Sequence, residues 1–110
     1  MNYIKTFALI SLLPLTAGAH EFTKEECVQL AKDVAYTVEI RDSGFSFGMM
    51  EKGILGWAQS QKGKEGYIKD DADVMLVYTL NKTVFSTTLN KEQIRTGVET
   101  RCLAALNEGK

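Results

Sequence analysis

The sequence predicts an all-α fold, namely a small up-down bundle of about four helices with one disulfide joining the first helix to the last. Apolar residues recur at spacings of three and four along most of the chain, which is the helical period. No proline follows Pro14. The chain of 110 residues holds two cysteines, Cys27 and Cys102, one near each end. An up-down bundle brings its first and last helices side by side, so the helical pattern and the cysteine positions favour the same architecture.

Residues 1–19 predict a cleaved signal peptide, with Lys5 at its positive start and the small residues Ala17 and Ala19 before the cleavage site. Its apolar stretch is shorter than the roughly 20 residues that span a bilayer. We therefore expect no membrane insertion after cleavage, and a retained N-terminal helix is the alternative. Cleavage leaves residues 20–110 as a single small helical domain.

Export and a single cysteine pair indicate an oxidising compartment, either the periplasm or the outside of the cell. We expect Cys27 and Cys102 to form a disulfide, with two free buried thiols as the alternative. A bridge that closes so long a loop removes roughly 4 kcal/mol of unfolded-state freedom in the chain-entropy description.

The first helix is predicted from Lys24 to Asp42. Thr23 and Glu26 have the spacing of a capping box, and Gly44 suits the left-handed residue that follows a helix. Apolar residues then form one stripe along this segment: Cys27, Leu30, Ala31, Val34 and Val38.

The second helix follows Ser46 as its cap, and it carries three glycines in its interior. Each interior glycine costs about 1 kcal/mol relative to alanine. Either the helix is short and broken, or the glycines permit another backbone to approach closely. The polar segment Gln59–Gly66 is predicted to be a loop.

The third helix is predicted from Tyr67 or Lys69 to Leu80, with aspartates in its first turns that suit the helix dipole. The β-branched segment Thr83–Thr88 favours an extended connection. A fourth helix is expected to begin near Asn90 or Lys91, because Asn90 and Gln93 have the spacing of a capping pair.

Composition and motifs exclude several functions. The formal net charge of -1 provides no basic face for nucleic acid. Two cysteines and a single histidine cannot make a four-ligand structural zinc site without carboxylates, and no metal or cofactor is expected. Phosphate-binding loops, dinucleotide fingerprints and nucleophile elbows are absent from the sequence. We therefore expect no enzyme, with a hydrolase of unrecognised site as a remote alternative.

The remaining candidates for function are apolar residues around the glycine-rich second helix. Tryptophan and methionine are adaptable contact residues at protein interfaces. A partner-binding surface is therefore predicted from five side chains, and the alternative is that most of them are core: Phe45, Phe47, Met49, Met50 and Trp57.

The two cysteines and a few residues at the predicted helix ends resemble a pattern seen in other proteins. Cys27, the segment Arg41-Asp42-Ser43-Gly44, Val77-Tyr78 and the closing Cys102 resemble a loose class of small exported proteobacterial proteins. The resemblance implies an exported location and a helical fold. Within it Arg41, Asp42 and Tyr78 are read as structural polar residues, through an ion pair or carbonyl cap and a partnered hydroxyl.

The sequence as a whole therefore predicts a non-enzymatic periplasmic module that binds an unidentified protein, as an inhibitor, immunity factor or accessory factor. The alternative is a periplasmic stress chaperone. The small acid-stress chaperones of the periplasm are similar in size, export and single disulfide, although their cysteines lie closer together in sequence.

Overall fold

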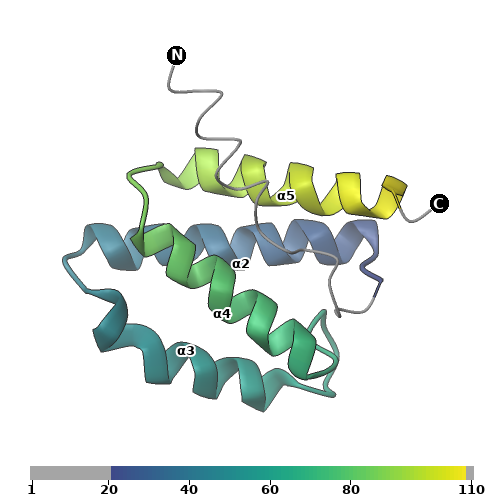
Figure 1. Cartoon of the computed structure of the whole chain (residues 1–110), viewed down its shortest axis with the longest axis horizontal. Helices are drawn as coiled ribbons and strands as arrows, with labels where there is room; N and C mark the ends of the chain where they lie inside the picture. The colour runs from purple at the N-terminus through teal and green to yellow at the C-terminus, as the bar shows by residue number, and fades with distance from the viewer. Residues whose placement is uncertain (1–20, 109–110) are drawn as a thin grey trace.

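The computed structural model describes residues 21–108, so the predicted signal peptide and His20 lie outside the described residues. This part of the chain forms four α-helices and no strand, which confirms the all-α prediction (Figure 1). The helices are α2 (Lys24–Asp42), α3 (Phe47–Gln61), α4 (Asp71–Phe85) and α5 (Lys91–Glu108).

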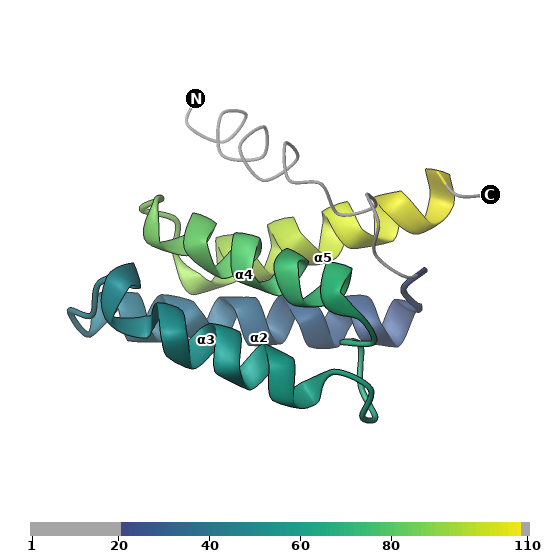
Figure 2. The same ribbon diagram turned by 60° about the horizontal axis from the view of Figure 1, so that its bottom comes forward.

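The four helices alternate in direction, and α2 packs against both α5 and α4 (Figure 1 and Figure 2). Helix α3 lies at the other side of the molecule from α5 and packs against α4. The largest fully buried side chains come from α2, α4 and α5, with none from α3: Leu30, Leu80, Ile94, Val34, Val38, Val74, Val77, Val84, Val98, Asp73 and Cys27.

A disulfide joins Cys27 on α2 to Cys102 on α5, with their Cα atoms 5.6 Å apart. Both cysteines are buried within the apolar interface of the two helices. The predicted bridge between the first and last helices is therefore confirmed, and the alternative of two free thiols is wrong.

Helix α2 begins and ends as its sequence predicts. The backbone N–H of Glu26 donates to Thr23 Oγ1 at 3.1 Å, and Thr23 N–H donates to Glu26 Oε1 at 2.9 Å. At the other end Gly44 has a φ of 101°, a left-handed conformation in which glycine has no Cβ penalty. Its N–H donates to the carbonyl of Arg41 at 3.0 Å.

Helix α3 is continuous despite its glycines, so the prediction of a short, broken helix is wrong. It extends to Gln61, two residues beyond the predicted start of the loop. A Cβ added at Gly53 or Gly56 would meet nothing within 4 Å, so these glycines do not admit a neighbouring backbone of this chain either. Packing of α3 on α4 offsets the helical cost of these glycines.

Helix α4 begins at Asp71, so the predicted start at Tyr67 or Lys69 is wrong, and Asp70 caps it by accepting from the N–H of Asp73. It ends at Phe85, five residues beyond the predicted end. The prediction of an extended segment from Thr83 is therefore wrong for its first three residues. Burial of Val84 in the core holds this last turn in the helix. The Thr83 hydroxyl is satisfied within the helix, because Oγ1 donates to the carbonyl of Thr79 at 2.9 Å. Tertiary burial thus overrides a local β preference.

Helix α5 begins at Lys91, as predicted. The N–H of Gln93 donates to Asn90 Oδ1 at 2.8 Å, and the N–H of Asn90 donates to Gln93 Oε1 at 3.0 Å. The two side chains thus satisfy each other's free amides at the helix start.

Candidate functional site

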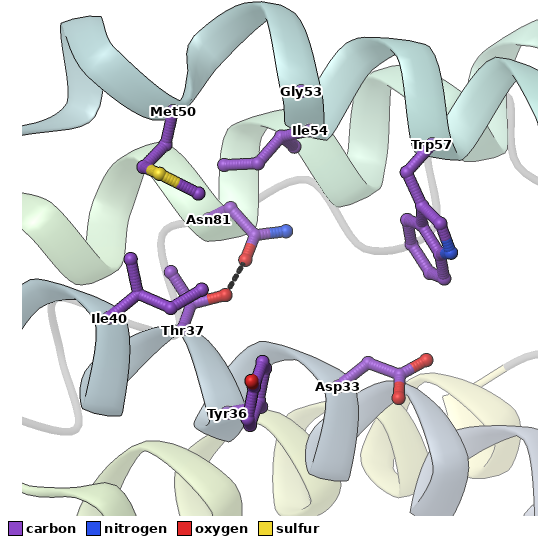
Figure 3. A pocket seen from close by; sticks show the side chains of 9 residues that line it. All are labelled: Asp33, Tyr36, Thr37, Ile40, Met50, Gly53, Ile54, Trp57 and Asn81. Atoms are coloured by element: carbon purple, nitrogen blue, oxygen red, sulfur yellow. Dashed lines mark hydrogen bonds between the residues drawn. The ribbon is translucent and has the colours of Figure 1, made fainter.

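A groove separates α2 from α3, and α4 forms its floor (Figure 3). This open groove has a volume of about 440 Å³, which is within the usual range for ligand sites. The side chains that line it come from three helices: Asp33, Tyr36, Thr37 and Ile40 of α2; Met50, Gly53, Ile54 and Trp57 of α3; and Asn81 of α4.

The groove exists because α3 is attached to α4 and not to α2. Phe47 makes aromatic contacts with Tyr78 and Phe85, with ring centroids 5.5 and 5.7 Å apart. The Tyr78 hydroxyl donates to Glu51 Oε2 at 2.6 Å, which adds a polar contact between the same two helices. These contacts turn one face of α3 toward α4 and leave the adjacent face directed at α2 across open space.

The walls of the groove are apolar and partly aromatic. Tyr36 of α2 is 60% exposed and Trp57 of α3 is 43% exposed, although both are large hydrophobic residues. Ile40, Met50 and Ile54 complete the two walls. Exposed aromatic side chains gathered around a concave surface are typical of binding sites.

The floor of the groove contains a buried polar pair. The Thr37 hydroxyl donates to Asn81 Oδ1, and Asn81 Nδ2 donates to the carbonyl of Val77 at 2.8 Å (Figure 3). Because these contacts use both polar groups of the Asn81 amide, the floor is polar and already hydrogen-bonded.

Asp33 lies at the same end of the cavity as Trp57, across from it (Figure 3). Its Oδ2 accepts a hydrogen bond from the Tyr67 hydroxyl at 2.6 Å, and its Oδ1 accepts one from Gln29 Nε2 at 3.0 Å. Burial raises the pKa of the Tyr67 phenol far above its ordinary value, and the hydrogen bond to Asp33 and the charge of Asp33 raise this pKa further. Tyr67 therefore remains a neutral donor that fixes the Asp33 carboxylate.

The five side chains predicted as a partner-binding surface do not share one surface. Met50 and Trp57 line the groove. Phe47 packs against α4, while Phe45 and Met49 are exposed outside the groove. The alternative that this set is mostly core does not hold for Trp57, because so much of its side chain is exposed.

The α2 wall was missed by sequence reasoning, which followed only the buried stripe of that helix. A second stripe was present at helical spacing, with Asp33, Tyr36, Thr37 and Ile40 beside the first. Its mixed polarity resembles an ordinary solvated face. Only the position of α3 opposite this stripe distinguishes it.

Arg41, Asp42 and Tyr78 lie outside the cavity. The Arg41 guanidinium donates to the carbonyls of Val84, Thr87 and Leu89 at 3.1, 3.0 and 2.7 Å, so it caps the end of α4 and the connection to α5. Asp42 pairs with Arg41 at 3.1 Å. The hydrogen bond from Tyr78 to Glu51 raises the pKa of the Tyr78 phenol above its ordinary value, with smaller contributions from burial and from the Glu51 charge.

Residues 21–108 hold neither a metal-binding cluster nor a helix that could cross a membrane. No group of three or more histidine, cysteine, aspartate or glutamate side chains in this range is arranged to hold a metal ion. No helix in the same range has the length and apolar character needed to cross a membrane. Comparisons of the chain with protein-family models, with curated proteins and with solved structures found no match.

Proposed function

We propose that this protein is a non-enzymatic module of the periplasm or the extracellular space that binds another protein, as an inhibitor, immunity factor or assembly accessory. The observation that carries the proposal is the groove between α2 and α3, where the aromatic side chains of Tyr36 and Trp57 are exposed on opposite walls and the half-buried Met50 lies on the same helix as Trp57. Its partner would insert side chains between the two helices and cover Tyr36 and Trp57.

The rigid attachment of one wall of the groove supports a binding role. One wall of the groove belongs to α2, which is joined to α5 by the disulfide and packs against two helices. The groove thus has a rigid side, which lowers the ordering cost of association. The disulfide is also typical of proteins in oxidising compartments, and the predicted signal peptide supports the same location.

Site-specific photo-cross-linking tests the proposal. A photoreactive residue at Tyr36 should give one discrete, stoichiometric adduct in cells, whereas the same residue at Glu25, outside the groove on α2, should give none. Trp57→Ala should abolish the adduct while leaving the helical circular dichroism and the disulfide intact. An adduct that is equally strong from Glu25, or unchanged in the Trp57→Ala protein, contradicts the groove as the binding site.

A second candidate is a periplasmic stress chaperone, favoured by the weak attachment of α3. Within the described chain, α3 contributes one residue, Ala58, to the buried core. Release of α3 from α4 would expose apolar surface on both helices. Cross-linking to many different proteins, only under denaturing stress, would favour this candidate over the single-partner module.

A further inference from the structure

The groove has an electrostatic asymmetry that indicates what enters it. Of the 9 residues that line the cavity, Asp33 carries the single charged side chain. No lysine or arginine lines the cavity to balance it. The lining therefore combines one negative charge with two aromatic rings and three aliphatic or thioether side chains.

The Asp33 carboxylate is held in place by its neighbours but not saturated by them. A carboxylate has about four lone-pair positions, and the hydrogen bonds from Tyr67 and Gln29 occupy two of them. The remaining capacity is available to a donor that enters the groove. Because Tyr67 is buried and fixed, such a donor would meet a preoriented acceptor.

The kind of partner can be inferred from the free energy of covering the groove with an apolar, an acidic or a cationic group. An apolar partner would remove water from Asp33 without supplying an opposite charge, which is unfavourable. An acidic partner would add repulsion. A cation near Trp57 and Tyr36 instead gains attraction from the aromatic faces as well as from the carboxylate.

Resting on the proposed function, we infer that the groove receives a lysine or arginine side chain of the partner protein. The cationic head lies between Asp33 and Trp57, and the aliphatic stem lies along the apolar wall formed by Ile54 and Met50. Lysine and arginine suit this geometry because their stems pack on apolar surface while their heads remain polar.

Three matched tripeptide amides test the inference: acetyl-Leu-Lys-Leu-amide and the same peptide with norleucine or glutamate at its centre. Trp57 is the single tryptophan of the chain, so its fluorescence reports directly on this end of the groove. We expect the lysine peptide to bind about tenfold more tightly than the norleucine peptide, and the glutamate peptide to bind most weakly.

Variants of α2 separate the charge from the shape of the groove. Asp33→Asn retains an acceptor for Tyr67, and it should remove the tenfold preference for the lysine peptide. Tyr36→Leu should weaken the lysine peptide about threefold through loss of one aromatic face. Glu25→Gln, the same charge change elsewhere on the same helix, should leave all three affinities unchanged.

Equal affinity for the lysine and norleucine peptides would overturn the inference while leaving the proposed binding function intact, because an uncharged apolar groove still binds a protein. Tighter binding of the glutamate peptide, or no change in Trp57 fluorescence with any of the three, would also overturn it. The cross-linking experiment at Tyr36 decides the proposed function independently of these results.

Discussion

Helices α2 and α3 both carry an apolar stripe at helical spacing, and both begin at a serine or threonine cap. In the fold, α2 packs against two helices and is joined to α5 by the disulfide, whereas α3 packs against α4. The same kind of stripe is therefore buried in α2 and partly exposed in α3. A helical pattern predicts an element, but the number of neighbours determines how much of its apolar face is covered.

This difference separates a stabilising part of the molecule from the part that lines the proposed binding groove. The interface of α2 and α5 contains the disulfide and contributes much of the buried core. Helix α3 adds little to that core and presents Met50 and Trp57 to the groove. Proteins commonly place binding residues on the parts that contribute least to global stability.

Removal of the disulfide, which stabilises α2 but not α3, should lower the free energy of unfolding more than substitution of Arg41 or Gly44. Cys102→Ser breaks the bridge between α2 and α5, and we expect the free energy of unfolding to fall by about 2–5 kcal/mol. Chemical denaturation followed by circular dichroism measures the change. A wild-type protein treated with reductant is the matched control, and a loss below about 1 kcal/mol in both would mean that α2 and α5 are held by packing alone.

Substitution of Arg41 should cause the second largest loss of unfolding free energy, because Arg41 joins the end of α2 to the end of α4. Arg41→Leu leaves the carbonyls of Val84, Thr87 and Leu89 without their guanidinium donor, and the expected loss is about 1–3 kcal/mol. Asp42→Ala is the control, since its exposed ion pair with Arg41 contributes about 0–1 kcal/mol. Equal losses in the two variants would contradict the capping role.

The free energy of unfolding should depend on pH through Tyr67, whose buried hydroxyl donates to Asp33 of α2. Because its folded pKa is raised, its contribution is fully present below the ordinary tyrosine pKa of about 10 and is lost as the pH rises above that value. The unfolded chain then releases a proton that the folded protein retains. We expect Tyr67→Phe to reduce the fall in unfolding free energy above pH 10 by about 1.4 kcal/mol per pH unit. Denaturation curves at a series of alkaline pH values measure this slope, and an unchanged slope would contradict the burial of Tyr67.

The smallest expected change is a gain of stability in α3. A Cβ at Gly56 meets open space, so Gly56→Ala should stabilise the protein by about 0.5–1 kcal/mol. Gly44→Ala is the contrasting control and should destabilise it by about 1–2 kcal/mol, because Gly44 has a positive φ.

Hydrogen exchange localises that gain. Amides of α3 should exchange faster than those of α2 and α5 in the wild type, and Gly56→Ala should slow exchange in α3 alone. Equal protection of all the helices in the wild type would contradict the proposed division between a rigid base and a weakly held wall.

Local sequence determined that this protein is helical and where α2, α3 and α5 begin. Each predicted cap is present, from Thr23 and Glu26 on α2 to Asn90 and Gln93 on α5, because these hydrogen bonds join residues three positions apart. The disulfide was also predictable, since only one cysteine pair exists and both members lie on apolar stripes. Contacts between residues a few positions apart depend only on local sequence, so they can be predicted from it.

Tertiary structure determined what local rules leave open. Helix α4 includes Val84 because that side chain is buried, although its β-branched surroundings favour an extended segment. Arg41 caps a helix more than 40 positions away, which its own sequence context does not indicate. The groove is the clearest case, because Asp33 and Tyr36 face Trp57 only through the packing of α3 on α4. The sequence by itself determined α2, the start of α5 and the disulfide, because these depend on local caps and on a single cysteine pair. Long-range packing decided the extent of α3 and α4 and which side chains face one another across the groove, because those contacts join residues far apart in the chain.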